Sequence, residues 1–219
     1  MSISPKASRH GDVGVMPAIG ITGGISTGKT SFCECLREIV PSAKFFDADQ
    51  AAHRLVDVDP EVKKEIRREF GDGIFLTDGG LNRGQLRTIV FSDAAKKRVL
   101  EQILHPRIRR QWSAEAERHR NSPDFFFADI PLLYETGGET LCDRVVVVAC
   151  SSNTQLRRVI ERRSLEPSAA EQMINSQMSL DQKIRRADHV VWNNGTYATL
   201  SEQAASLLKL WRNQSWTRS

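Results

Sequence analysis

The stretch AIGITGGISTGKTSF at residues 18–32 decides the fold of this chain. From Gly23 onward it matches G-x-x-x-x-G-K-[ST], the pattern of a phosphate-binding loop that leads from a buried strand into a helix. Glycines let such a loop curl so that backbone N–H groups point at anionic oxygens, and the helix adds the positive end of its dipole. An ordinary glycine-rich turn is the alternative, but the complete spacing argues against it. The stretch therefore predicts a phosphate site.

The residue types of this loop predict how a nucleotide is held. Lys29 can reach the β- and γ-phosphates of the nucleotide, and the Thr30 hydroxyl can ligate Mg²⁺. Residues 18–22 have the apolar character of a short buried strand, and Phe32, Leu36 and Ile39 continue at helical spacing. The predicted nucleotide-binding residues of the loop are Gly23, Gly24, Ile25, Ser26, Thr27, Gly28, Lys29, Thr30 and Ser31.

Composition bounds the protein class without selecting a function. The chain has 219 residues, 26% of them charged and 40% hydrophobic, as in a globular protein with one large domain or with a core and insertions. Its net charge of +4 suits a polyanionic ligand, and it equally suits an ordinary basic surface. No apolar run approaches the length of a membrane span, so no membrane partner is expected. The basic residues lack interleaved aromatic residues, so no nucleic-acid partner is expected.

Cysteines and the N-terminal residues point to a reducing compartment. The four cysteines lack C-x-x-C spacing, and Cys33 and Cys35 do not face each other on a helix, so we expect reduced packing residues. Residues 1–17 lack the apolar segment of a secretory signal, and Asp12 interrupts any amphipathic transit helix. We expect a flexible leader, or a start at Met16, and a cytoplasmic location.

Acidic residues follow two predicted strands. Residues 43–46 end in Asp47-Ala48-Asp49, and residues 125–128 end in Asp129. The carboxyl ends of parallel strands are where open α/β sheets bind ligands. Asp47 or Asp49 could orient Mg²⁺ or accept a proton from an attacking hydroxyl, while the other could cap the next helix. Asp129 has the position of a Walker-B-like aspartate, which helps to hold Mg²⁺, often through water.

The remaining chain predicts a helical insertion and a charged lid. Residues 50–120 contain no convincing strand, and Pro106 falls within a helix that we expect to be kinked or restarted. On spacing alone, His53 and His105 are more often solvated or packing residues than ligands. Residues 155–163 form a helix rich in arginine that could close over the transferred phosphate, although a solvated helix is the alternative. Residues 145–150 and 187–192 are further strands, so alternating strands and helices predict an α/β core with a parallel sheet.

Several motifs in one order resemble the dephospho-coenzyme A kinase family. The resemblance extends from about residue 18 to about residue 208. The residues that carry it are Thr22-Gly23-Gly24-Ile25, Gly28-Lys29-Thr30, Asp47-Ala48-Asp49, His105-Pro106, Pro131-Leu132-Leu133 with Glu135, Arg158, Arg162, Gln177, Lys183, Ala187-Asp188 and Asn193-Asn194-Gly195.

The resemblance implies ATP-dependent phosphorylation of the ribose 3′-hydroxyl of dephospho-coenzyme A, the last step of coenzyme A synthesis. It implies that Asp49 is the general base and that Arg162 is a catalytic lid arginine. It also places Arg158, Asn194 and Gly195 at the nucleotide, and Asp49, His53, His105 and Leu133 at the acceptor. The metal ligands expected are Thr30, Asp49 and Asp129.

The resemblance also implies a three-layer P-loop core with a helical insertion and a mobile lid. The expected core comprises residues 18–48, 124–150 and 181–219. The coenzyme-binding insertion spans residues 49–123, the lid spans residues 151–180, and a monomer is favoured.

The chain departs from the family pattern in its loop. The family usually has Gly-Ser where this chain has Ser26-Thr27, and Ser-Thr where it has Thr30-Ser31. Threonine can replace serine as a metal ligand, whereas Ser26 would put the loop in doubt only if it needed a positive φ.

Two other kinds of function stay open from the residues alone. One is a P-loop kinase for a nucleoside or a nucleoside monophosphate. The other is a P-loop switch or a nucleic-acid-stimulated ATPase, although the Asn-Lys-x-Asp segment expected of a GTPase is absent from the sequence.

Overall fold

A five-stranded parallel sheet forms the centre of the molecule. The computed structural model describes residues 17–119 and 122–214. The strands are β1 (Ala18–Gly23), β2 (Lys44–Asp47), β3 (Phe126–Asp129), β4 (Arg144–Ala149) and β5 (His189–Trp192), in the order β2-β3-β1-β4-β5. All four pairings are parallel, so every strand ends at the same edge of the sheet. The predicted α/β class is confirmed.

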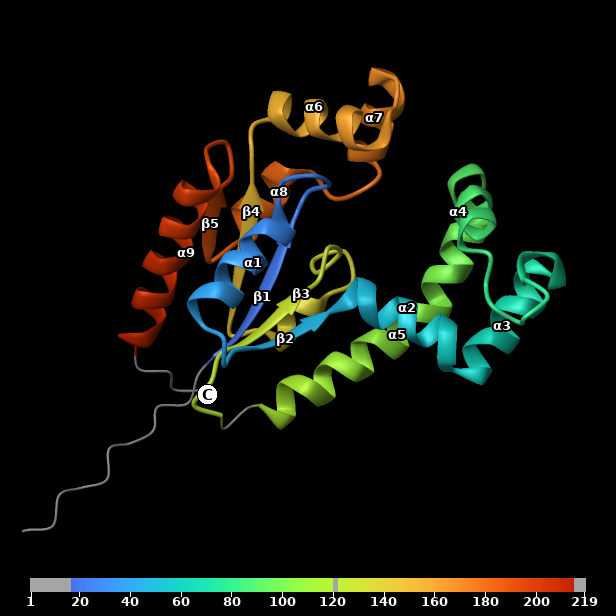
Figure 1. The fold of residues 1–219 in the computed structure, drawn as a ribbon, viewed down its shortest axis with the longest axis horizontal. Coiled ribbons are helices and arrows are strands. Elements are labelled where there is room, and N and C mark those ends of the chain that lie inside the picture. The colour runs from blue at the N-terminus through green and yellow to red at the C-terminus, as the bar shows by residue number, and fades with distance from the viewer. Residues whose placement is uncertain (1–16, 120–121, 215–219) are drawn as a thin grey trace, which may run out of the picture.

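Two helices cover one face of this sheet. They are α1 (Lys29–Ile39) and α9 (Tyr197–Arg212), which lie side by side (Figure 1). Phe32 of α1 and Trp211 of α9 pack with Ile19, Ile21 and every second residue of the neighbouring strands in one buried cluster. The alternation of side chains along each strand sends the intervening residues to the other face.

The other face is covered by α2 (Ala48–Val58), α5 (Ala94–Arg118) and α8 (Leu180–Arg186). Ala51 of α2, Trp112 of α5 and Ile184 of α8 pack with Val145 and Val147 of β4. The two covered faces give the expected three layers.

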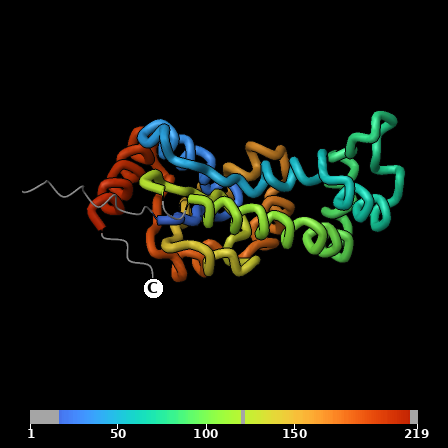
Figure 2. Tube along the Cα trace, turned by 90° about the horizontal axis from the view of Figure 1, so that it is seen from below, coloured from blue at the N-terminus to red at the C-terminus, as the bar shows by residue number. Residues whose placement is uncertain are grey.

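The region predicted as an insertion extends from the sheet and has its own core. It comprises α2, α3 (Pro60–Phe70), the 3₁₀ turn Asp72–Ile74, α4 (Arg83–Ser92) and α5 (Figure 1). Ile66, Ile74 and Leu86 belong to a cluster separate from the sheet, so the molecule is elongated (Figure 2). Helix α5 runs without a restart through Pro106, so the restarted alternative is wrong. None of the helices in residues 17–119 and 122–214 has the length and apolar character needed to cross a bilayer.

The segment predicted as the lid projects beyond the carboxyl edge of the sheet. It contains α6 (Ser152–Arg163) and α7 (Pro167–Asn175) (Figure 1). The 3₁₀ turn Gly138–Leu141 lies before β4. The division of the chain into core, insertion and lid stays a prediction, and the predicted leader falls almost entirely outside the described residues. The four cysteines are free, as expected.

Candidate active site

The sheet brings remote parts of the chain to one edge. The phosphate loop (residues 23–30) starts at the last residue of β1, Asp47 ends β2 with Asp49 two residues later, and Asp129 ends β3. A cavity of about 530 Å³ opens there between α1 and α2. Its lining residues are Lys29, Thr30, Glu34, Arg37, Phe45, Asp47, Asp49, Gln50, Arg54 and Asp129. Asp47, Asp49 and Asp129, at the ends of two strands, therefore face the same cavity as Lys29 and Thr30 of the loop.

The turn of the phosphate loop needs Gly28. This residue caps α1 with φ 97°, and a Cβ built on it would lie 1.8 Å from Asn193 Nδ2. Its neighbour Thr27 is fully buried, and the Thr27 hydroxyl donates to Gly24 O at 3.0 Å. The first N–H groups of α1 have no partner within the helix, so this end can receive an anion.

Ser26 adopts a positive φ, which is unfavourable for residues other than glycine. Its φ is 58°, in the left-handed region, where a side chain costs about 1–2 kcal/mol. Ser26 therefore meets the one condition under which its side chain would put the loop in doubt. The loop closes nevertheless, because buried contacts hold the residues on both sides of it.

Those contacts come from two residues that sequence reasoning did not place in the site. Gln155 Nε2 donates to Ile25 O at 2.9 Å, and Asn193 Nδ2 donates to Thr27 O at 2.9 Å. Asn193 belonged to the motif that carried the resemblance, whereas nothing in the sequence distinguished Gln155. Arg158 Nη1 also lies 3.4 Å from Thr27 O, so α6 is anchored to the loop.

Lys29 and Asp129 form an ion pair across the cavity. The other oxygen of Asp129 accepts from the Cys33 thiol, with an Sγ–Oδ2 distance of 3.5 Å. Burial and the nearby Asp129 charge raise the pKa of the Cys33 thiol, which is therefore a neutral donor. Both carboxylate oxygens of Asp129 are thus engaged by protein groups.

Asp47 fills the capping role that was considered for the two aspartates. The Asp47 side chain caps α2 by accepting from Gln50 N at 2.9 Å. Asp49 sits in the first turn of α2 and keeps its carboxylate free for the cavity. Desolvation by the surrounding protein raises the pKa of Asp49, although the positive charge of Lys29 opposes this rise. A raised pKa makes the carboxylate a better proton acceptor.

A second, mostly apolar cavity of about 500 Å³ adjoins the first. Its wall includes Asp49 together with Leu104, His105 and Trp112, and with Leu132 from the turn after β3. Burial lowers the pKa of His105, with Glu101 opposing, which favours the neutral imidazole. Asp49 therefore stands where the two cavities meet.

Two predicted acceptor residues are placed elsewhere. Leu133 is fully buried in the core, where it packs against Gly20, and its neighbour Leu132 lines the cavity instead. His53 is exposed on α2, one turn beyond Asp49, and lines neither cavity. The structure thus places Leu133 in the core and Leu132 on the cavity wall, and it leaves His53 outside the cavity walls.

The remaining predicted nucleotide and lid residues do not line the first cavity. Asn194 Oδ1 accepts from Ser151 N at 2.8 Å and so joins the end of β5 to the start of α6. Gly195 is exposed beside it. Arg162 is exposed in the last turn of α6, away from the cavity lining. Ser31 is half-buried in the first turn of α1.

The donor set fits Mg²⁺ better than a transition metal. Mg²⁺ prefers oxygen ligands and binds through one or two carboxylates together with phosphates and water. The first cavity presents the Thr30 side chain and the Asp49 and Asp129 carboxylates. Residues 17–119 and 122–214 contain no cluster of three or more His, Cys, Asp or Glu side chains that could enclose a metal by themselves.

A family model, a curated relative and two solved structures are similar to this chain. The family model described as dephospho-CoA kinase matches residues 17–199. A dephospho-CoA kinase from Symbiobacterium thermophilum is 40% identical over 198 residues, which are 90% of this chain and 81% of that protein. A solved protein from Thermus thermophilus is 30% identical with a TM-score of 0.70, covering 88% of this chain and 96% of that one. A solved dephospho-CoA kinase from Campylobacter jejuni is 26% identical with a TM-score of 0.63, covering 89% and 96%.

Proposed function

The chain belongs to the dephospho-CoA kinase family, and from this premise we propose that it transfers the γ-phosphoryl group of ATP to dephospho-coenzyme A. The acceptor atom is the ribose 3′-hydroxyl, and the products are coenzyme A and ADP. The observation that carries the proposal is the place of Asp49, on the wall shared by the polar cavity and the apolar cavity. A group that must meet both substrates belongs at such a junction.

The two cavities suit the two substrates. ATP would lie along the phosphate loop, where the loop amides and the start of α1 favour anions. The acceptor would enter the apolar cavity, whose side chains Leu104, Trp112 and Leu132 suit the pantetheine arm. The neutral His105 can donate or accept a hydrogen bond there.

The transfer step needs a base and an in-line approach. The acceptor oxygen attacks the γ-phosphorus, the bond from this phosphorus to the bridging oxygen of ADP breaks, and Asp49 takes the hydroxyl proton. The raised pKa of Asp49 supports this role. Positioning and electrostatic stabilisation supply most of the catalysis in phosphoryl transfer.

Positive charge for the transferred group comes from several elements. Lys29 pairs with Asp129 in the free protein and would turn to the phosphates when the nucleotide enters. Arg158 is already held against the loop, whereas the exposed Arg162 would reach the phosphates through closure of the lid. A normal kcat in the Arg162→Met variant would contradict a role of Arg162 in the transfer step. Mg²⁺, held by Thr30, Asp49 and Asp129, would add positive charge at the phosphate oxygens when bound.

Three broader expectations complete the proposal. The protein acts in the cytoplasm, as a monomer, and without nucleic acid. Light scattering of the purified protein tests the monomer, and an ATPase assay with added DNA or RNA tests the independence from nucleic acid.

Phosphorylation assays with dephospho-coenzyme A, adenosine and AMP test the proposed acceptor. We expect a strong preference for dephospho-coenzyme A, with the new phosphate on the ribose 3′-oxygen by phosphorus NMR. A preference for adenosine or AMP would instead favour a nucleoside or nucleoside monophosphate kinase.

A further inference from the structure

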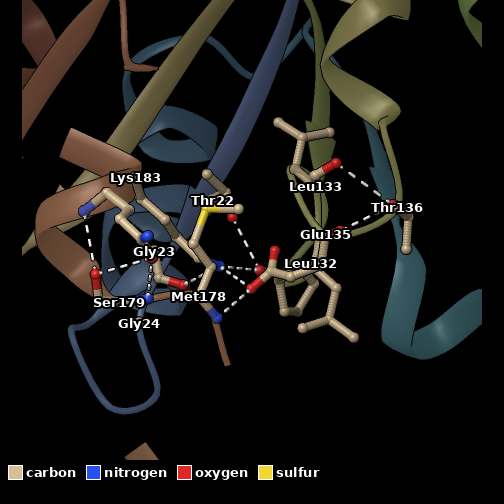
Figure 3. Close-up of polar contacts among 12 residues, drawn as sticks. Thr22, Gly23, Gly24, Leu132, Leu133, Glu135, Thr136, Met178, Ser179 and Lys183 are labelled. Carbon is tan, nitrogen blue, oxygen red and sulfur yellow. Dashed lines mark hydrogen bonds and ion pairs between the residues drawn. The ribbon is translucent and has the colours of Figure 1, made fainter. Parts of the chain in front are cut away.

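Lys183 has a completely buried side chain, and the mechanism proposed above gives it no role. It lies on α8, the first helix after the lid. Its Nζ lies 2.9 Å from Pro131 O, 3.0 Å from Glu135 Oε1 and 3.3 Å from Gly23 O (Figure 3). An ammonium has three N–H donors, and each of the three acceptors comes from a different position of the chain. The group is therefore fully satisfied.

Burial of this charge needs a reason beyond packing. Burial lowers the pKa of Lys183, and the hydrogen bond to Glu135 opposes that effect. Replacing a buried ion pair by apolar side chains of similar volume is often neutral or stabilising, so the pair is weak support for a purely structural role. Its three acceptors indicate instead what the lysine positions.

Gly23 is the first residue of the phosphate loop, and Lys183 holds its carbonyl. A trans peptide is planar, with its C=O and N–H pointing in opposite directions. The contact therefore fixes the direction of the Gly24 N–H, which is the first amide inside the loop. The neighbouring strand also approaches Gly23 closely, since a Cβ built on this residue would lie 2.5 Å from Val148 O. Lys183 thus orients the entry to the loop.

The other contacts of Lys183 lead to the apolar cavity. Pro131 and Glu135 line this cavity, as does Leu132 between them. The Glu135 carboxylate also accepts from Met178 N at 3.0 Å, at the return from the lid (Figure 3). The Thr22 hydroxyl donates to Pro131 O at 2.9 Å, which ties the same turn to β1. The Lys183 side chain therefore links this cavity wall directly to the phosphate loop.

We propose that Lys183 is a positioning residue that couples the apolar cavity to the phosphate loop through Glu135 and Gly23. Occupation of the cavity holds Pro131 and Glu135, these hold the ammonium, and the ammonium holds the Gly23 peptide in its anion-binding orientation. Acceptor and nucleotide then strengthen each other's binding. The identity of the acceptor rests on the function proposed above, whereas the effect of Lys183 on the loop does not.

Binding of a non-hydrolysable ATP analogue, measured by calorimetry with and without saturating dephospho-coenzyme A, tests the coupling. In the native protein we expect the acceptor to tighten analogue binding several-fold, and the analogue to tighten acceptor binding by the same factor. In Lys183→Met, analogue binding without acceptor should weaken about tenfold, and the coupling factor should fall to about one. Arg185→Met is the control, because it removes an exposed charge from the same helix and should keep the native factor.

Two results would overturn the proposal. One is a native protein without coupling, and the other is a Lys183→Met protein that folds and retains the native factor. If Lys183→Met does not fold, Glu135→Gln replaces it, because glutamine keeps an oxygen that can accept from the buried ammonium. This variant replaces the charged bond at position 135 by a weaker one and keeps the contacts to Gly23 and Pro131, so it should bind the analogue normally and show a smaller coupling factor. A native coupling factor in Glu135→Gln would count against the proposal. Failure of the native protein to phosphorylate dephospho-coenzyme A would instead contradict the proposed function. In that case, binding of the ATP analogue without acceptor would still test the effect of Lys183 on the phosphate loop.

Discussion

Lys29 and Asp129 form an ion pair that joins the first residue of α1 to the last residue of β3. The exposed fractions of their side chains are 14% and 9%, so the pair is largely shielded from water. With Cys33 donating to its other oxygen, Asp129 has little capacity left for direct contact with a metal. We therefore expect Asp129 to contact Mg²⁺, through water, only after the nucleotide has drawn Lys29 away.

Replacing Arg158 by Met should weaken nucleotide binding. Arg158 lies against the loop carbonyl of Thr27, at the predicted phosphate site, and a charged hydrogen bond contributes about 1.5–3 kcal/mol. We expect the Kd for an ATP analogue to rise at least about tenfold, as measured by calorimetry. Arg157→Met is the control, since Arg157 is exposed and faces Glu161 on the same helix. Equal effects of the two variants would contradict the assignment.

Replacing Ser26 by Gly should stabilise the free protein. Glycine removes the cost of a side chain at φ 58°, about 1–2 kcal/mol, and loses about 0.4–1 kcal/mol through the greater freedom of the unfolded chain. The free energy of unfolding in urea should rise by about 0.5–1 kcal/mol. Ser164→Gly is a matched control, because Ser164 has φ 50° at the end of α6. A loss of stability in Ser26→Gly would show that its hydroxyl or its conformation stabilises the loop.

Leu132 and Leu133 should respond differently to replacement by Ala. Leu132 lines the apolar cavity, so Leu132→Ala should raise the KM for the acceptor about tenfold with a modest change in stability. Leu133 is fully buried, so Leu133→Ala should cost about 2–5 kcal/mol of unfolding free energy. Steady-state kinetics and urea unfolding separate the two effects. The reverse pattern would place the acceptor elsewhere.

Activity should fall in acid at a higher pH than an ordinary aspartate would give. The active form of Asp49 is deprotonated, and desolvation raises its pKa above the usual 3.8. Lowering the pH through this raised pKa protonates the base, so kcat/KM should decline there and reach a plateau above it. A profile of kcat/KM against pH, recorded above the range of acid unfolding, measures the midpoint. A midpoint at or below 3.8 would contradict the raised pKa.

Much of the site could be predicted because its chemistry lies in short sequence motifs. The phosphate loop has fixed spacing, and the two acidic strand ends must meet it once the sheet is parallel. The contacts that orient this loop could not be predicted in the same way. Lys183 lies 160 residues from Gly23, and Gln155 lies 130 residues from Ile25, so only the folded chain brings them together.

Local geometry decided the other features of the site that could not be predicted from the sequence. Sequence position could not decide which of Leu132 and Leu133 faces the cavity, because both are apolar residues of one turn. The positive φ of Ser26 follows from the closure of the loop around its neighbours rather than from the preference of serine. Likewise, the division of roles between Asp47 and Asp49 depended on the first residue of α2, which the sequence defined only to within a residue or two.

The central claim is that phosphoryl transfer takes place at Asp49, and the kcat of Asp49→Asn tests it most directly. The account predicts a kcat lower by about 10²–10⁴-fold, with little change in the Kd for an ATP analogue measured without Mg²⁺. The variant should unfold at no lower temperature, because a carboxylate with a raised pKa costs stability at neutral pH. Asp47→Asn is the control and should keep most of the activity, since asparagine also caps a helix. A near-normal kcat in Asp49→Asn would contradict the account.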